Sequence, residues 1–198
     1  MSEYTNSAVF LDRDGTISPE LNKDIPILTP EEFTLIPKTG EAISKLNKHK
    51  IKVIVITNQS AIAKGYITEE TLLKIHEKMV ELLAKEDAHL DDIFYCPHYP
   101  NGKIAKYSKI CDCRKPNPGL INLAQEKYKL DLSKCFCVGD MVRDIELGYN
   151  LHMRNILVLT GKGKQTQEEL LKTGHSPEYI ATDLFEAVNY IEKTLSKN

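Results

Sequence analysis

The sequence predicts an α/β fold, a three-layer α/β/α sandwich in which a mainly parallel β-sheet lies between two layers of helices. Short apolar runs rich in β-branched residues alternate along the chain with segments of helical periodicity, and this alternation is typical of parallel sheets. The chain has 198 residues, enough to bury a substantial core, and it contains no internal repeat and no low-complexity linker. We therefore expect residues 1–198 to form a single domain.

Six runs are the expected strands of this sheet. Each is a short apolar segment, mostly β-branched or aliphatic, which favours extended structure. In chain order they are Ala8–Leu11, Ile51–Ile56, Ile93–Tyr95, Cys135–Val138, Ile156–Leu159 and Tyr179–Ala181.

Helical patterns fill the segments between these strands. Thr68 is an expected N-cap, and Asn117 is an expected cap followed by Pro118 in the first turn. The expected helices are Thr39–His49, Thr68–Lys85, Asn117–Tyr128, Val142–Asn150, Thr166–Thr173 and Leu184–Leu195.

Composition and charge narrow the possible partners. The formal net charge is −2 and the basic residues are scattered, which argues against a nucleic-acid-binding face. No apolar run approaches the length of a membrane span, and the first residues lack the charged start and apolar stretch of a secretory signal. We expect a cytoplasmic protein that binds neither nucleic acid nor membrane. The sequence is compatible with a monomer and leaves the oligomeric state open.

Asp12 and Asp14 directly follow the first expected strand. At i and i+2 on extended backbone their side chains point to the same side, and Gly15 lets the chain leave at angles that other residues resist. Two carboxylates this close repel each other unless a cation or a shared proton relieves the repulsion. One interpretation is therefore a Mg²⁺ site in which one carboxylate attacks and the other transfers protons. The alternative is a polar turn with two surface aspartates.

Other strands should also end in chemically useful residues if the aspartate pair forms a site, because sites in parallel sheets lie beyond the carboxyl ends of the strands. The run Thr57-Asn58-Gln59-Ser60 follows the second strand and suits either an anionic oxygen or a capping turn. Asp140 follows the fourth strand, with Asp144 one helical turn later, and could complete a cluster for a hard cation or end the strand in a simple turn. Lys115 precedes an expected helix, within reach of a phosphate, although a lone lysine is usually a surface residue.

The order and spacing of these motifs resemble the haloacid dehalogenase (HAD) superfamily of phosphatases. The resemblance extends from about Val9 to Gly161. It implies a HAD-like, Rossmann-like sheet and a phosphomonoesterase that works through an aspartyl-phosphate. The segments between the motifs are too short for a large cap domain, so we expect an open site. The motifs are Asp12-Arg13-Asp14-Gly15-Thr16, Thr57-Asn58-Gln59-Ser60, Arg114-Lys115-Pro116 and Gly139-Asp140.

The resemblance implies a role for each motif. Asp12 would be the nucleophile, and Asp14 would protonate the leaving oxygen and then activate water. Mg²⁺ would be held by Asp12, the backbone carbonyl of Asp14 and Asp140, with Asp144 acting through water. Thr57 and Lys115 would hold the transferring phosphoryl group. An anionic nucleophile can approach an anionic phosphate only when Mg²⁺ and a lysine offset the repulsion.

A second motif consists of Cys96-Pro97-His98 and Cys111-Asp112-Cys113. In a reducing compartment such clusters more often bind metal than form disulfides. Cys96, His98, Cys111 and Cys113 make a complete tetrahedral ligand set for a structural Zn²⁺, which would hold a zinc-binding loop at residues 96–113.

Two alternatives to this zinc site remain. In the first, the thiols are unrelated to one another and the imidazole is a surface group. In the second, the ligands are the two Cys-x-Cys pairs, Cys111 and Cys113 with Cys135 and Cys137. The second set is disfavoured because Cys135 and Cys137 lie in a buried strand, where cysteine commonly acts as a small apolar residue.

The Cys/His motif narrows the resemblance to the group of histidinol-phosphate phosphatases and D-glycero-D-manno-heptose 1,7-bisphosphate 7-phosphatases. The twelve residues between His98 and Cys111 are similar in length to the loop of the heptose enzymes. The resemblance then implies a phosphorylated sugar as substrate, the heptose bisphosphate of lipopolysaccharide precursor synthesis. Histidinol phosphate or another small amino-alcohol phosphate is the alternative, and a DNA 3′-phosphatase is disfavoured by the acidic balance.

Substrate binding is expected from Thr57, Asn58, Gln59, Ser60, Arg114 and Lys115, with Glu20–Lys23 nearby. Two features depart from the heptose enzymes. Met141 stands where they usually carry Lys, a charge that Arg143 could replace, and residues 18–37 do not match their usual loop. The non-enzyme alternative is a catalytically silent, zinc-stabilised binding module, which the complete set of catalytic residues disfavours.

Overall fold

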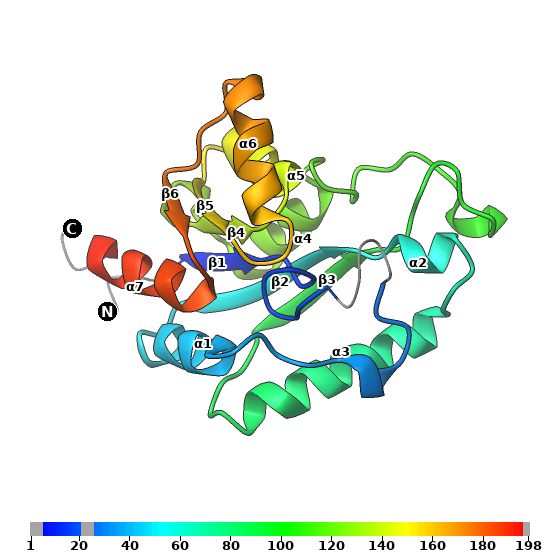
Figure 1. Cartoon of the computed structure of the whole chain (residues 1–198), viewed down its shortest axis with the longest axis horizontal. Helices are drawn as coiled ribbons and strands as arrows, with labels where there is room; N and C mark the ends of the chain where they lie inside the picture. Colours follow the sequence, from blue (N-terminus) through cyan, green and yellow to red (C-terminus); the bar gives the residue numbers. More distant parts are fainter. Residues whose placement is uncertain (1–5, 21–25, 196–198) are drawn as a thin grey trace.

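A six-stranded parallel sheet forms the centre of the computed structural model, which describes residues 6–20 and 26–195 (Figure 1). The strand order is β3-β2-β1-β4-β5-β6, and each neighbouring pair is parallel. Helices cover both faces, which confirms the predicted α/β sandwich. The strands are β1 (Ala8–Leu11), β2 (Lys52–Asn58), β3 (Asp92–Cys96), β4 (Phe136–Gly139), β5 (Arg154–Val158) and β6 (Tyr179–Ala181).

The helices follow the predicted order, with three differences. The four-residue helix α2 was not predicted, because it is too short to show periodicity. The helix predicted to begin at Thr166 begins three residues earlier, at Gly163. A Cβ atom at Gly163 would lie 1.8 Å from the carbonyl oxygen of Val158, so the chain passes close to the end of β5 here. The α-helices are α1 (Thr39–Lys48), α2 (Ser60–Ala63), α3 (Glu69–Ala84), α4 (Gly119–Tyr128), α5 (Val142–Asn150), α6 (Gly163–Thr173) and α7 (Leu184–Leu195).

The third difference concerns a helix cap. Thr68 caps α3 as predicted, because its hydroxyl accepts a hydrogen bond from the backbone N–H of Thr71 at 3.1 Å. At α4 the prediction was wrong: Pro118 is the cap, and the side chain of Asn117 donates instead to the carbonyl of Cys111 at 2.9 Å. A tertiary contact therefore outweighs the local capping signal.

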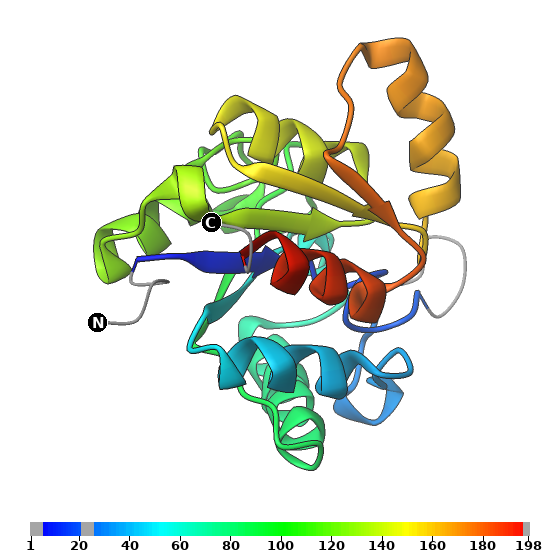
Figure 2. The same ribbon diagram turned by 90° about the vertical axis from the view of Figure 1, so that its left-hand side faces the viewer.

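Alternate residues of the sheet pack into two hydrophobic cores. Val9 and Leu11 of β1 face one core, which α1, α3 and α7 cover, whereas Ala8 and Phe10 face the other, which α4 and α5 cover. All four residues are fully buried. Figure 2 shows these helices on either side of the strands. Because both faces are covered, the open edge of the sheet at the carboxyl ends of the strands is where a site can form.

The strand order places the candidate motifs together. β1 lies between β2 and β4, so the residues that follow these three strands meet at one edge of the sheet. The chain between Asp12 and β2 contains, in its described part, a short 3-10 helix (Pro30–Glu32) and α1. Across the described residues, we find no helix with the length and apolar character needed to cross a membrane.

Candidate active site

Three buried aspartates gather at the carboxyl ends of β1 and β4. Asp12 follows β1, Asp140 follows β4, and Asp144 lies in the first turn of α5. One carboxylate oxygen from each lies within 4.8 Å of the others, and none of the three residues is more than 3% exposed. Three of the four aspartates that the sequence singled out for a cation site are thus brought together, whereas the side chain of Asp14 is not part of the group. We call Asp12, Asp140 and Asp144 the carboxylate cluster.

The carboxylate cluster carries more negative charge than it can keep without a cation. Burial, followed by the charges of Asp12 and Asp144, raises the pKa of Asp140 to about 8. Oδ2 of Asp140 accepts a hydrogen bond from the backbone N–H of Lys162 at 2.8 Å, whereas its buried Oδ1 has no hydrogen-bond partner in the described structure. An unpartnered buried oxygen in an all-oxygen donor set fits a hard divalent cation such as Mg²⁺.

Lys115 partly balances the carboxylate cluster. Its Nζ lies 3.1 Å from Oδ1 of Asp12, 2.7 Å from Oδ1 of Asp144 and 2.7 Å from the carbonyl oxygen of Ile56. Burial lowers the pKa of Lys115, but the charges of the two aspartates outweigh it and the pKa is raised. Burial likewise opposes ionisation of Asp12, yet Lys115 and then Arg143 outweigh it and lower the pKa of this carboxyl. Asp12 is therefore held as an anion.

Asn58 fixes the backbone from which Lys115 reaches the cluster. Oδ1 of Asn58 accepts a hydrogen bond from the backbone N–H of Lys115 at 3.0 Å, and Nδ2 of Asn58 donates to the backbone carbonyl of Lys115 at 3.1 Å. Both ends of the Asn58 amide are thus engaged with the protein. The structure places this residue, expected among the substrate-binding groups, behind the lysine.

The side chain of Asp14 lies outside the carboxylate cluster and faces a pocket. Arg13 donates to it from Nε at 3.0 Å and from Nη2 at 2.9 Å, and Gln59 donates from Nε2 at 2.9 Å. The carboxylate is 30% exposed, whereas the Arg13 side chain is fully buried. The Asp14 carboxylate is therefore fixed by hydrogen bonds on one side and faces the pocket on the other.

A buried polar frame supports this arrangement from behind. Nη1 of Arg13 lies 3.2 Å from Nε2 of His76 on α3, and Nη2 donates to Oε1 of Gln59 at 3.0 Å. Gln59 also donates to the hydroxyl of Thr57 at 2.8 Å. Burial, followed by the charge of Arg13, lowers the pKa of His76 to about 3, so the neutral imidazole can accept from the guanidinium. The frame thus fixes Asp14.

Gly15 allows the turn that follows Asp14 to pass close to the carboxylate cluster. Its φ is +85°, in the left-handed region, and a Cβ atom here would lie 2.2 Å from Oδ2 of Asp140. Its backbone N–H donates to the carbonyl of Ser18 at 2.7 Å. The glycine predicted from the sequence is therefore required both by backbone conformation and by close approach.

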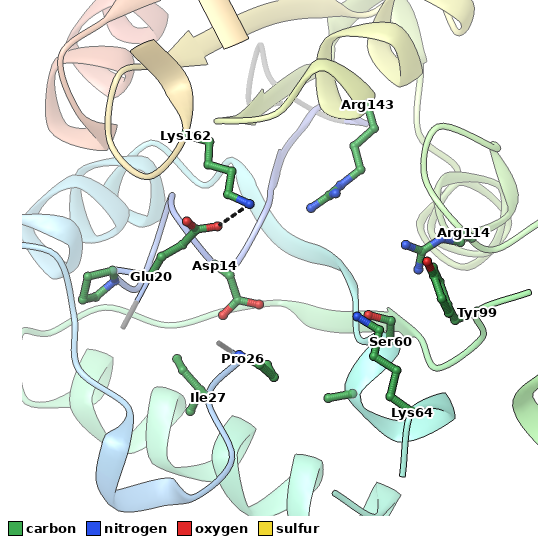
Figure 3. A pocket seen from close by; sticks show the side chains of 12 residues that line it. Asp14, Glu20, Pro26, Ile27, Ser60, Lys64, Tyr99, Arg114, Arg143 and Lys162 are labelled. Atoms are coloured by element: carbon green, nitrogen blue, oxygen red, sulfur yellow. Dashed lines mark ion pairs between the residues drawn. The ribbon is translucent and has the colours of Figure 1, made fainter. Parts of the chain in front are cut away.

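A pocket of about 250 Å³ lies over Asp14 (Figure 3). Four cationic side chains and two acidic ones line it, which favours an anionic ligand. Lys162 and Glu20 face each other across it at 3.9 Å. Of the predicted Glu20–Lys23 segment, Glu20 lines the pocket, and the rest lies outside the described residues. The charged lining residues are Asp14, Glu20, Lys64, Arg114, Arg143 and Lys162.

The predicted substrate-binding residues divide into two sets. Ser60 and Arg114 line the pocket. The hydroxyl of Thr57 and the amides of Asn58 and Gln59 instead form hydrogen bonds within the protein, and Lys115 contacts the carboxylate cluster, as described above.

Cys96, His98, Cys111 and Cys113 also come together, and could hold a metal ion. Their sulfur atoms lie 3.2–3.5 Å apart, and Nδ1 of His98 lies 3.2 Å from the sulfur of Cys113. We call these four residues the Cys/His cluster. Three thiols and one imidazole are the donor set of closed, structural zinc sites.

The alternative set of four cysteines has no support in the structure. The thiols of Cys135 and Cys137 donate to the backbone carbonyls of Asp131 at 3.3 Å and Asp144 at 3.4 Å. Burial raises the pKa of Cys135 to about 11. Both residues belong to a hydrophobic core, so they act as small apolar side chains.

The Cys/His cluster positions one wall of the pocket. Nη1 of Arg114, the residue after Cys113, donates to the carbonyl of His98 at 3.1 Å. Two cations lie over the ring of Tyr99, with Cζ of Arg114 at 5.2 Å and Nζ of Lys64 at 5.1 Å from its centroid. The loop thus delivers Arg114 to the pocket in a fixed place.

Comparison with known proteins assigns the chain to a family. A HAD-hydrolase-like family model matches residues 112–187. The D-glycero-D-manno-heptose-1,7-bisphosphate 7-phosphatase of Chlorobaculum tepidum is 35% identical over 187 residues, which cover 91% of each chain. The D-glycero-beta-D-manno-heptose-1,7-bisphosphate 7-phosphatase of Haemophilus influenzae is 39% identical over 79% of this chain and 84% of that one. The chain belongs to the HAD phosphatase family.

A solved structure leads to the same family. The crystal structure of D,D-heptose 1,7-bisphosphate phosphatase from B. bronchiseptica, complexed with magnesium and phosphate, aligns with a TM-score of 0.81 and 32% identity. The alignment covers 94% of this chain and 99% of that one. The resemblance inferred from the sequence motifs is thereby confirmed, and this HAD phosphatase is an enzyme that hydrolyses phosphate esters.

Sequence reasoning missed two parts of the site of this HAD phosphatase. No sequence motif includes His76, yet it contacts Arg13 behind Asp14. Lys162 also lies outside the motifs, yet its backbone N–H donates to Asp140. An Asp-Arg-Asp motif with a buried arginine needs a buried acceptor, and this requirement is the signal that could have pointed to His76.

Proposed function

We propose that this HAD phosphatase removes the 7-phosphate of D-glycero-D-manno-heptose 1,7-bisphosphate in a Mg²⁺-dependent reaction. The observation that carries the proposal is the carboxylate cluster with its lysine: Asp12, Asp140 and Asp144 lie together, Lys115 contacts two of them, and a pocket with four cationic side chains lies next to them. The named relatives and the B. bronchiseptica complex with magnesium and phosphate support the substrate and the metal.

The number of cations in the pocket favours a bisphosphate over histidinol phosphate. Among the described residues, Lys162 is the only one of the four with an ion-pair partner, so the positive charges of Lys64, Arg114 and Arg143 are not balanced by a carboxylate in direct contact. Histidinol phosphate carries one phosphate and a positive amino group, which this lining would repel. A sugar with two phosphates uses the positive charge more fully.

Mg²⁺ would be held by Asp12, the backbone carbonyl of Asp14 and Asp140, with Asp144 acting through water. It would supply positive charge to the phosphoryl oxygens, so that an anionic carboxylate can approach phosphorus. Lys115 adds a second charge beside the nucleophile, since its Nζ lies 3.1 Å from Asp12. The unpartnered Oδ1 of Asp140 is the observation in this chain that fits such an ion.

The two aspartates of the first motif would divide the chemistry. A carboxylate oxygen of Asp12 attacks phosphorus, the bond from phosphorus to the sugar oxygen breaks, and Asp14 gives its proton to that oxygen. Asp14, now a carboxylate, takes a proton from water. The water oxygen then attacks the aspartyl-phosphate, and the bond to Asp12 breaks to release phosphate. Arg13 and Gln59 keep Asp14 at the pocket throughout.

The Cys/His cluster would hold one structural Zn²⁺ per chain. Its four ligands leave no position for substrate or water, so the ion would stabilise the loop that positions Arg114.

Asp12→Asn tests the mechanism. The variant should fold with an unchanged Tm and lose turnover by about 10⁴-fold or more, because an amide cannot attack phosphorus. Asp87→Asn, at an exposed residue with a φ of +54° that asparagine tolerates, is the matched control and should retain full activity. Retained turnover in Asp12→Asn would exclude the aspartyl-phosphate.

The substrate is tested separately by measuring kcat/KM of the unmodified enzyme. Heptose bisphosphate should exceed histidinol phosphate by at least about 10²-fold, because the second phosphate gains at least one charge-assisted contact. The reverse order would overturn the substrate while leaving the phosphatase activity in place.

A further inference from the structure

Arg143 points into the pocket without a hydrogen-bond acceptor. It lies in the first turn of α5, one residue before Asp144, and Figure 3 shows its guanidinium on the pocket wall between Asp14 and Arg114. Its Nε is buried and has no partner, and within residues 6–20 and 26–195 no side chain or carbonyl forms a hydrogen bond or ion pair with the guanidinium. The donors of Arg143 are therefore directed at the space that a ligand would fill.

The Arg143 side chain is half-buried and its Nε is fully buried, so an unused donor at Nε is costly and calls for an explanation. The neighbouring carboxylates stabilise the positive charge of Arg143, but they do not accept its hydrogen bonds. Burial lowers its pKa, but the charges of Asp144, Asp12 and Asp140 outweigh burial and raise it. These charges act from beyond hydrogen-bonding distance. The five N–H donors of the guanidinium remain to be matched by an acceptor from outside the protein.

The other cations near the nucleophile are already committed. Lys115 directs Nζ at three acceptors, namely Asp12, Asp144 and the carbonyl of Ile56, which equals its three N–H groups. Arg114 donates to the carbonyl of His98 and lies against Tyr99. Arg143 thus differs from both in having its whole hydrogen-bonding capacity free.

The position of Arg143 also defines what it would bind. Burial, followed by the charge of Arg143, lowers the pKa of Arg114, so the two guanidinium groups are close enough to repel each other. An anion bound between them removes this repulsion. The charge of Arg143 also lowers the pKa of Asp12, as the largest charge contribution after that of Lys115. The anion that Arg143 faces is therefore next to the nucleophile.

We propose that Arg143 is a substrate-binding residue whose guanidinium donates hydrogen bonds to the non-bridging oxygens of the phosphoryl group that Asp12 attacks. This inference rests on the proposed phosphatase mechanism and adds a residue to it. A planar fork of donors matches two oxygens of a phosphoryl group, and it stabilises their charge during transfer. Met141, at the start of the same helix, brings no charge to the pocket, so Arg143 is the cation that α5 contributes.

Arg143→Gln in the Mg²⁺-loaded enzyme tests this assignment. Inorganic phosphate serves as a competitive inhibitor of p-nitrophenyl phosphate hydrolysis, and its Ki should rise about tenfold or more, as expected for the loss of a charged hydrogen bond. kcat/KM for p-nitrophenyl phosphate and for heptose bisphosphate should fall by similar factors. Half-saturation by Mg²⁺ should be no weaker, since the substitution removes a cation near its ligands.

Two further variants control this experiment. Arg143→Lys keeps the charge without the fork, so phosphate Ki should lie between the values for the wild type and for Arg143→Gln. Lys172→Gln removes one positive charge from an exposed position on α6 and should leave Ki unchanged. Thermal unfolding of each variant checks that it is folded.

Three results would overturn the assignment. An unchanged phosphate Ki in Arg143→Gln would leave Arg143 without a role in phosphate binding. A loss confined to heptose bisphosphate would move Arg143 to the second phosphate. Weaker Mg²⁺ binding with an unchanged Ki would make it a support of the carboxylate cluster only. Failure of the unmodified enzyme to hydrolyse any phosphate ester would instead refute the proposed function, independently of Arg143.

Discussion

The two candidate metal sites of this protein are built in opposite ways. The carboxylate cluster offers oxygen atoms from the ends of two parallel strands and the start of a helix, next to an open pocket. The Cys/His cluster offers sulfur and nitrogen from the two ends of one loop, and four such ligands complete a tetrahedron. The first arrangement leaves room for a substrate, and the second leaves none.

The two sites also differ in what holds them in place. The backbone N–H of Asp12 donates to the carbonyl of Val138 at 3.0 Å, so the sheet fixes the carboxylate cluster. The loop of residues 99–110 has little core of its own: Ile110 is 85% exposed and Ile104 is 42% exposed, and Tyr107 packs at the edge of a core. The sheet therefore positions the carboxylate cluster, whereas we expect a metal ion at the Cys/His cluster to stabilise the loop that carries it.

Cys113→Ser should have the largest effect of the substitutions that test this difference between the two sites. Bound zinc should fall from one ion per chain to none, with a loss of stability of about 4 kcal/mol or more and a Tm about 10 °C lower. Protease should then cut within residues 99–110. Half-saturation by Mg²⁺ should not change, because the sheet still holds the carboxylate cluster.

Cys135→Ser is the matched control for this substitution. It removes a buried thiol outside the Cys/His cluster, so zinc content should remain at one ion per chain. An unchanged Tm in zinc-free Cys113→Ser would show that the loop does not depend on its ligands.

Gly15→Ala should damage the carboxylate cluster without affecting the loop. A Cβ atom at Gly15 would lie 2.2 Å from Oδ2 of Asp140, so the carboxylate must shift, and we expect a loss of about 10²-fold in kcat/KM. Gly174→Ala is the control, since Gly174 has a similar φ of +73° but nothing within 4 Å of the added atom. It should cost about 1 kcal/mol of stability and leave activity intact. Equal activity in the two variants would mean that the close approach to Asp140 is unimportant.

The sequence predicted the sheet and the carboxylate cluster because both depend on local order along the chain. Two of the apolar runs that became strands lead directly into residues of the carboxylate cluster, so strand ends and site residues were found together. These residues are Asp12 and Asp140, since β1 and β4 end immediately before them. Parallel neighbours with aligned ends then bring them together.

The polar frame could not be predicted from the sequence, because its contacts join distant parts of the chain. His76 and Arg13 are 63 residues apart, and nothing in the spacing of α3 marks His76 as an acceptor. Gln59 was expected to bind substrate, and only the folded geometry directs its amide at Asp14 and Thr57. Motif order identifies the residues that carry the chemistry, whereas the directions of their hydrogen bonds require the tertiary structure.

His76→Gln should change the pH dependence of stability, the smallest of the three effects. The folded pKa of His76 is about 3, below the unfolded value of 6.5, so between these values the unfolded chain takes up a proton that the folded protein does not. The wild type therefore loses about 1.4 kcal/mol per pH unit from this group as pH falls below 6.5, or about 2 kcal/mol by pH 5. Glutamine keeps an acceptor for Arg13 and does not titrate, so urea unfolding should show that this loss disappears in the variant. His89→Gln, at an exposed position, should follow the wild type, and a wild-type pH dependence in His76→Gln would mean that the imidazole is not the buried neutral acceptor behind Arg13.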